Sequence, residues 1–314
     1  MFQSCSKLVV EIFRFAKSDF KPWVYAYSAL AIGTLIAINY TSELYKNILQ
    51  NSYFNNTSML YFALFYSAVY FMVLIPILLL DKQLPLLKKK STYLKPLIFI
   101  VLYSISVGYF DYRTWRIDTL FYEENVYLIR IISQLKSLII FFIPLVIIKL
   151  YYDKKVNGLY GIAKGGSEIV GYFVFFLLLL PFIVFASFTP DFQKAYPQFK
   201  PWEYEGIFNF PTWLYTLIFQ ISYAIDFIMT ELMFRGALVI GLISVLNKRA
   251  VLPMVALYCV IHFGKPLAET VSSVFGGYIL GALAYQTRHI WGGIIVHILI
   301  ALAMEIAALA QYYK

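Results

Sequence analysis

Long apolar stretches, separated by short polar ones, run through the whole chain. The first five lie at about 22–40, 59–80, 93–110, 131–150 and 169–189. An unbroken run follows at 211–247, and the last three stretches are 250–263, 270–287 and 290–312. About 20 apolar residues in a helix span the hydrocarbon core of a bilayer. The pattern therefore predicts an all-α protein, a polytopic transmembrane helix bundle with about eight or nine membrane segments.

Two of these stretches depart from the length of an ordinary span. The run at 211–247 is too long for one helix perpendicular to the membrane. It is therefore strongly tilted, broken, or continued as a surface helix. The stretch at 250–263 is short enough to be re-entrant, which leaves the topology beyond residue 250 open.

Composition excludes a soluble domain. Hydrophobic residues make up 61% of the 314 residues and charged residues 14%, against about a quarter charged in an ordinary soluble domain. Lys and Arg number 26 against 17 Asp and Glu, but they lie in short stretches between the spans. We interpret these cations as topology signals and expect the lipid bilayer, and no nucleic acid, as a partner.

The basic residues alternate along the chain. The first six stretches outside the spans hold four, one, five, three, four and two Lys or Arg residues. By the positive-inside rule the N-terminus and the loops at 81–95 and 151–168 are cytoplasmic, whereas the 191–205 loop lies on the other side. This predicts an integral protein of the cell (inner) membrane with a cytoplasmic N-terminus.

Ionisable residues inside the spans gather in the last third of the chain. Earlier spans hold mainly Lys136, which we expect to snorkel to an interface. The later segments contain Asp226, Glu231, Arg235, His262, Glu269, His297 and Glu305. Each charge at the centre of a span costs about 2.5–3.5 kcal/mol. The clustering therefore predicts a polar site within the bundle.

This contrast divides the chain into two parts. Residues 1–165 form the N-terminal transmembrane helices. They begin with an interfacial amphipathic helix, because charged residues interrupt its apolar positions. Residues 166–314 form the core that carries the polar site.

Spacing leaves two interpretations of the acidic and basic residues in this core. Glu231 and Arg235 are four apart and share one helical face, as an internal ion pair or as part of a catalytic site. Next to them, Gly236 would let another helix approach closely. A histidine such as His262 or His297 is either a hydrogen-bonded core residue or part of the site. Glu305 shares a face with His297 by spacing, or faces solvent near the chain end.

Three segments in this region fit a known pattern. They are Thr230-Glu231-Leu232-Met233-Phe234-Arg235-Gly236, Tyr258-Cys259-Val260-Ile261-His262 and His297-Ile298-Leu299-Ile300-Ala301. In order and spacing they resemble the motifs of the CAAX protease and bacteriocin-processing (CPBP) family of intramembrane proteases. Those motifs are Glu-Glu-x-x-x-Arg, aromatic-x-x-x-His and His-x-x-x-Asn/Asp/Ser. Phe-Arg-Gly after the acid and His-Ile-Trp-Gly-Gly before the last histidine strengthen a resemblance that covers about 220–310.

The resemblance implies a role for each matching residue. Glu231 and Arg235 become the structural acid and its partner. His262 becomes the water-activating histidine, and His297 stabilises the oxyanion or faces a metal. A divalent metal such as zinc on His262, His297 and Glu231 agrees with these roles.

Two positions depart from the family pattern. Thr230 replaces the first glutamate, and Ala301 replaces the final polar residue. Threonine does not ionise near neutral pH, so position 230 supplies no carboxylate base. Glu231 is one substitute. Glu269 is the other, because it would lie close to the face of His262 if the helix continued through Pro266.

Three functions are consistent with these observations. The preferred one is an intramembrane endopeptidase that uses glutamate- and histidine-activated water. It would hydrolyse a peptide bond near the cytoplasmic face in a membrane-embedded or membrane-associated peptide. The departures favour a second, a catalytically degenerate relative that acts as a scaffold or chaperone for membrane proteins. A third, a proton-coupled transporter, is disfavoured by the charge-poor N-terminal half.

Overall fold

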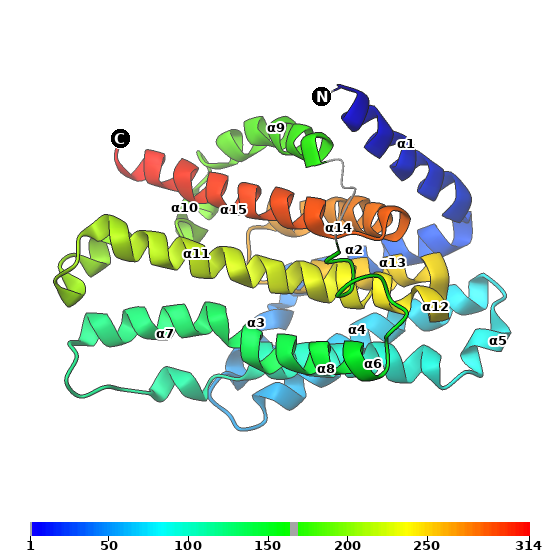
Figure 1. Ribbon diagram of the computed structural model, residues 1–314, viewed down its shortest axis with the longest axis horizontal. Coiled ribbons are helices and arrows are strands. Elements are labelled where there is room, and N and C mark those ends of the chain that lie inside the picture. The colour runs from blue at the N-terminus through cyan, green and yellow to red at the C-terminus, as the bar shows by residue number, and fades with distance from the viewer. Residues whose placement is uncertain (1, 164–168) are drawn as a thin grey trace.

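The computed structural model describes residues 2–163 and 169–314 as a bundle of helices (Figure 1). The α-helices are α1 (Phe2–Asp19), α2 (Pro22–Ser42), α3 (Leu44–Ile48), α4 (Ser58–Leu80), α5 (Leu84–Leu87), α6 (Ser91–Gly108), α7 (Tyr122–Ser137), α8 (Ile143–Tyr151), α9 (Ile169–Ala186), α10 (Pro190–Ala195), α11 (Thr212–Glu231), α12 (Ile243–Leu246), α13 (Val251–Val260), α14 (Leu267–Thr287) and α15 (Trp291–Tyr312). Shorter 3₁₀ and π turns are η1 (Gln50–Ser52), η2 (Asp111–Thr114), η3 (Leu138–Phe142), η4 (Pro201–Tyr204), η5 (Ile207–Asn209), η6 (Leu232–Ala237), η7 (Ile240–Leu242) and η8 (Asn247–Ala250).

Eight helical segments within the described residues are long and apolar enough to cross a membrane. They are Pro22–Ser42, Ser58–Leu80, Ser91–Thr114, Tyr122–Tyr151, Ile169–Ala186, Thr212–Val260, Leu267–Thr287 and Trp291–Tyr312. Over the described ranges the chain forms no β-strand. The prediction of an all-α, polytopic bundle is therefore confirmed.

The long apolar run is broken rather than tilted. The helix α11 ends at Glu231, and a π turn, η6, continues the chain to Ala237. Short turns then lead to α13, a helix of 10 residues whose side chains are all buried. A helix that is apolar all round belongs in the interior of a bundle. Accordingly, the most apolar part of Thr212–Val260 is 78% buried, against 22% for Pro22–Ser42.

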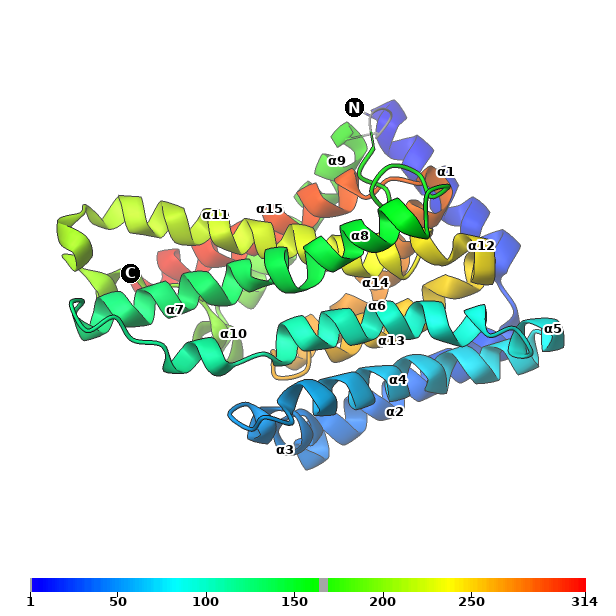
Figure 2. The same cartoon turned by 60° about the horizontal axis from the view of Figure 1, so that its bottom comes forward.

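The helices around this central segment form layers (Figure 2). Helix α4 packs between α2, α6 and α13, while α15 contacts α9 and α11. The first helix, α1, lies against α9 and α14 and buries Leu8 and Phe15. The apolar face of α1 thus packs against the bundle. The predicted position of α1 at the membrane interface stays a prediction. The predicted division between residues 165 and 166 lies outside the described residues.

The loops with many cations meet at one end of the bundle, which we call the basic end. It comprises residues 81–95, 151–163 and 247–250. There the Asp81 carboxylate pairs with Lys21 and Arg249. Lys95 and Asp153 form a second ion pair between loops, with Nζ 2.7 Å from Oδ1.

The loops with few cations lie at the opposite end (Figure 1). The indole of Trp202, in the 191–205 loop, stacks on Tyr312 near the C-terminus with ring centroids 3.7 Å apart. Helices α5 and α12 lie at the right of the view, whereas α10 and the C-terminus lie at the left. The alternating charge pattern therefore sorts the loops into two groups. Which group faces the cytoplasm stays a prediction from the positive-inside rule.

This orientation can be measured by single-cysteine labelling. After Cys5 and Cys259 are replaced by alanine, Lys89→Cys and Glu203→Cys place one thiol at each end of the bundle. We expect a membrane-impermeant maleimide to modify position 203 in intact cells and position 89 only after the membrane is opened. Labelling of both from outside would contradict the arrangement of the loops, and the reverse order would invert the orientation.

Candidate active site

The predicted acid, arginine and last histidine form one buried cluster. Glu231 at the end of α11 and Arg235 in η6 are 0% and 1% exposed, and Arg235 Nη1 donates to Glu231 Oε1 at 2.8 Å. His297 on α15 donates from Nδ1 to the same oxygen at 3.0 Å. The internal ion pair is therefore present, and a histidine from another helix joins it.

The side chain and backbone of Tyr258 connect this pair to the remaining histidine. The guanidinium carbon of Arg235 lies 4.0 Å from the centroid of the Tyr258 ring, a cation–π contact. The Tyr258 hydroxyl is 3.5 Å from His297 Nε2, and the Tyr258 carbonyl is 2.8 Å from His262 Nδ1. We call Glu231, Arg235, Tyr258, His262 and His297 the Tyr258 cluster.

Tyr258 stands in the second motif, whose pattern assigns a role only to the histidine. Its position four residues before His262 was the available signal, because residues four apart lie one turn apart on a helix. The contacts of Tyr258 with residues of α11, η6 and α15 arise from tertiary packing. The spacing of residues along the chain therefore could not predict them.

Hydrogen-bond partners determine the tautomers of the two histidines. A carbonyl or carboxylate only accepts, so Nδ1 carries the proton in both His262 and His297. In each neutral ring Nε2 then keeps its lone pair. Two imidazole nitrogens able to accept a proton therefore belong to one cluster.

The two glycines of His-Ile-Trp-Gly-Gly have separate packing roles. A Cβ atom on Gly293 would lie 2.4 Å from Glu231 Oε2, and one on Gly292 would lie 2.2 Å from the Tyr172 ring of α9. Neither position has room for a side chain. Gly293 brings α15 against the acid, and Gly292 brings α9 against α15.

A third glycine contradicts our expectation for Gly236. Its neighbour is the loop residue Tyr160, whose carbonyl oxygen would be 2.9 Å from a Cβ there. A loop, and not a helix, therefore makes the close approach. Tyr160 is held in this position because it is fully buried and because its hydroxyl donates to Asp153 at 2.7 Å.

Both positions that depart from the family pattern are buried. Thr230 is 9% exposed and lies within hydrogen-bonding reach of Tyr103 on α6. Ala301 is 4% exposed. The Thr230 hydroxyl therefore has a structural partner.

Glu269 lies on α14 and makes a different set of contacts. The Tyr196 hydroxyl is 3.0 Å from both of its carboxylate oxygens and is 3.2 Å from Lys265 Nζ. Burial, and then the charge of Glu269, raise the pKa of the Tyr196 phenol far above its usual value, so it remains a donor. The helix does not continue through Pro266, because α13 ends at Val260 and α14 begins at Leu267. The premise of a helix continued through Pro266 is therefore wrong, and the role of Glu269 as a substitute base stays a prediction.

Glu305 does not face solvent. It is 2% exposed, and its carboxylate accepts the backbone N–H groups of Gln198 and Phe199 at 2.6 and 3.3 Å. The loop that contains Gln198 and Phe199 folds back over α15, and the Glu305 carboxylate is the acceptor for its backbone N–H groups. This long-range contact explains a buried acid that spacing could not predict.

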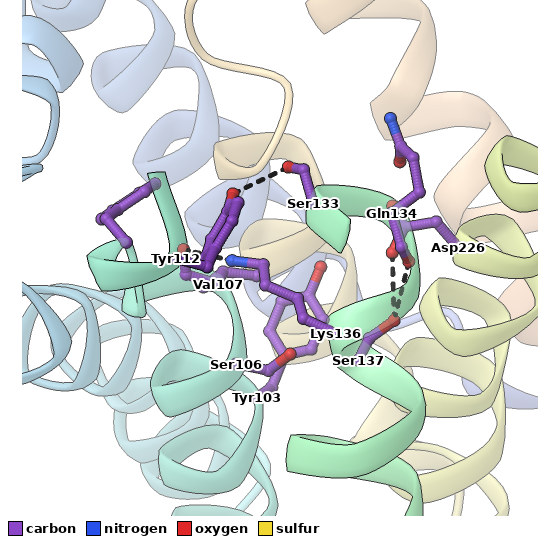
Figure 3. Close-up of a pocket in the computed structure, with 10 residues that line it drawn as sticks. Tyr103, Ser106, Val107, Tyr112, Ser133, Gln134, Lys136, Ser137 and Asp226 are labelled. Carbon is purple, nitrogen blue, oxygen red and sulfur yellow. Dashed lines mark hydrogen bonds between the residues drawn. The ribbon is translucent and has the colours of Figure 1, made fainter. Parts of the chain in front are cut away.

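A cavity of about 200 Å³ lies between α6, α7 and α11 (Figure 3). Tyr103 lines it together with Asp226 of α11 and Lys136 of α7. Asp226 Oδ1 accepts from Ser137 Oγ at 3.3 Å. At about 30 Å³ per molecule, a cavity of this size has room for several waters.

Lys136 reaches the C-terminal end of α6. Its ammonium donates to the carbonyls of Val107 and Tyr109, at 3.3 and 3.1 Å, where α6 ends (Figure 3). A cation is stabilised at the C-terminus of a helix, whose last carbonyls have no partners within the helix. Lys136 therefore caps α6, and its snorkelling to a membrane interface stays a prediction.

The donor groups of the cluster do not fit a metal held by three protein ligands. Across residues 2–163 and 169–314, no three His, Cys, Asp or Glu side chains converge as ligands. A catalytic zinc site typically has three. The first oxygen of Glu231 is already shared by Arg235 and His297. We therefore derive no step through a metal.

Comparison with known proteins gives one match. A family model described as Type II CAAX prenyl endopeptidase Rce1-like matches residues 210–303. The matched segment contains every residue of the Tyr258 cluster and confirms the resemblance drawn from the motifs. No curated protein and no solved structure matches the chain.

The buried ion pair makes a prediction for stability. Arg235→Ala leaves a buried carboxylate without its cation and should cost about 3–5 kcal/mol of unfolding free energy. Replacing both Glu231 and Arg235 by alanine should cost less than the sum of the single changes. Thermal melts in detergent measure both effects.

An exposed pair of the same residue types is the matched control. Arg14 lies 2.5 Å from Glu11 and its side chain is 62% exposed. Arg14→Ala should therefore change stability by less than about 1 kcal/mol. Equal effects at positions 14 and 235 would show that Arg235 is not buried as described.

A second prediction concerns the contact of α15 with the acid. Gly293→Ala should cost about 1–3 kcal/mol because the added methyl group collides with Glu231 Oε2. Gly276→Ala on α14 is the control, since its Cβ would meet nothing within 4 Å. It should leave the melting temperature unchanged or raise it. If both changes were equally tolerated, the close approach of α15 would be refuted.

Proposed function

Since residues 210–303 match a family model described as Type II CAAX prenyl endopeptidase Rce1-like, we propose that this protein is an intramembrane endopeptidase and that the Tyr258 cluster is its active site. One observation carries the proposal. The two histidines implied by the resemblance meet at Tyr258, and each has its Nδ1 proton held by an acceptor. This leaves Nε2 of each ring for chemistry.

His262 is the proposed general base. Its Nε2 takes a proton from water as the water oxygen attacks the peptide carbonyl, and the same nitrogen returns that proton to the leaving amine. His262 Nδ1 is hydrogen-bonded to a backbone carbonyl and not to a carboxylate. The positive charge of the His262 imidazolium is therefore only modestly stabilised. The expected turnover is correspondingly slow.

His297 is the proposed oxyanion partner. The Glu231 carboxylate accepts from Nδ1 and orients the His297 ring, as an acid does for a catalytic histidine. When Nε2 also carries a proton, its N–H donates to the oxygen that becomes negative. Arg235 neutralises the remaining charge of Glu231 and fixes the position of the carboxylate.

The position of the cluster supports cleavage near the basic end. The indole of Trp291, at the start of α15, donates to the carbonyl of Ala163 in that end. At 1.5 Å per residue, His297 lies about 9 Å further along the helix. With the predicted orientation, a peptide entering from the cytoplasmic membrane surface reaches it. The cavity lined by Tyr103 and Asp226 offers a source of water.

A second function is favoured by the two departures from the family pattern. Thr230 and Ala301 remove one acid and one polar group, and both positions are buried. A relative that has lost hydrolysis would still bind a membrane peptide at the cluster. It would act as a scaffold or chaperone.

Three variants distinguish these functions. Purified protein in liposomes is incubated with membrane peptides, and products are identified by mass spectrometry. For an active protease, His262→Ala should reduce the rate by about 10²–10⁴. His289→Ala, a histidine outside the cluster, should have little effect. Thr230→Glu should change the rate little or lower it, because it adds a second carboxylate beside Glu231.

Other outcomes decide against one candidate each. An inactive wild type that gains turnover with Thr230→Glu would identify the lapsed protease. Normal cleavage by His262→Ala would eliminate the proposed mechanism, because His262 supplies its general base.

A further inference from the structure

A second and larger cavity lies at the basic end, away from the Tyr258 cluster. Its volume is about 600 Å³. It is formed where α8 ends, where η7 and α12 pass, and where α14 ends. Its lining includes three basic residues, Lys154, Lys155 and Arg288, and two apolar ones, Ile240 and Ile243.

The cations of this cavity have no acidic partner. Within the described ranges, no ion pair joins a carboxylate to Lys154, Lys155 or Arg288. Asp153 also lines the cavity, but its charge is already balanced. Lys95 Nζ lies 2.7 Å from its Oδ1, and the Tyr160 hydroxyl donates to its Oδ2 at 2.7 Å. The cavity therefore carries a net positive charge that an anion would neutralise.

An exposed apolar face leads along η3 and α8 to this cavity. Ile139, Ile143 and Ile147 are 68%, 49% and 49% exposed, and Leu150 is 60% exposed. In a membrane-spanning segment such residues face acyl chains. Tyr151 and Tyr152 follow, both exposed, as is typical of the level of lipid headgroups. The cations come directly after these aromatic residues.

We propose that this cavity binds the headgroup of an anionic phospholipid. The phosphate lies among Lys154, Lys155 and Arg288, and the acyl chains lie along Ile240, Ile243 and the exposed face of α8. Basic pockets between transmembrane helices on the cytoplasmic side bind such headgroups. A soluble phosphate would use the cations and leave the apolar residues without a role, which is why a lipid is the better fit.

The proposal is tested with purified wild-type protein in nanodiscs of phosphatidylcholine that contain increasing amounts of phosphatidylglycerol. Melting temperature and retention of lipid in native mass spectrometry are measured at fixed ionic strength. Phosphatidylglycerol should raise the melting temperature and remain bound. A cation near a membrane surface contributes about fivefold to the affinity for anionic lipid. The triple change Lys154→Gln, Lys155→Gln and Arg288→Gln should therefore weaken retention by about 100-fold.

The basic end supplies a control of equal charge. Lys88, Lys89 and Lys90 are exposed at the same end and do not line the cavity. Their replacement by glutamine should preserve retention and the lipid-dependent rise in melting temperature. Inorganic phosphate at the same concentration should give no rise.

Three results would overturn the proposal. The first is equal loss of retention in both triple variants, which would show a diffuse surface effect. The second is an equal response to phosphatidylcholine alone, which would remove the requirement for an anion. The third is full stabilisation by inorganic phosphate, which would identify a site for a soluble anion and not for a lipid.

Discussion

The bundle depends on how the charge of Glu231 is compensated inside the membrane. An ionised carboxylate in low dielectric is stable when cations and donors surround it. Arg235 supplies the cation from the adjacent π turn, and His297 supplies a second donor from α15. Gly293 completes the arrangement because the absence of a side chain lets α15 come close. The relative position of α11 and α15 is thus specified by one acid.

The π turn connects this electrostatic requirement to the path of the chain. Such turns interrupt α-helices and are frequent at functional sites. Here η6 carries Arg235 and ends α11, and the chain then passes through short turns into α13. Tyr258 of α13 covers the guanidinium with its ring and holds His262 through its carbonyl. The contacts that pack α13 against η6 are therefore also the contacts that position the candidate catalytic residues.

Sequence reasoning succeeded where the cause is local. Hydropathy predicted the spans because each must match the bilayer, and the charge count separated the loops of the two ends. Spacing allowed the pair of Glu231 and Arg235, since residues four apart share a face. It failed for Glu305 and the approach to Gly236. Their partners are backbone N–H groups and a loop tyrosine that come from distant parts of the chain. Chain folding brings these groups together, so no local pattern records them.

The short length of α13 has a consequence for biogenesis. Its 10 residues extend about 15 Å, half the thickness of the hydrocarbon core. Such a helix cannot enter the bilayer as an independent span, and its buried surface requires α2, α4 and α14 as neighbours. The packing of α13 is therefore complete only when α14 lies beside it. A chain that stopped after residue 262 would contain Tyr258 and His262 but neither α14 nor the helix that brings His297, so one side of α13 would stay uncovered.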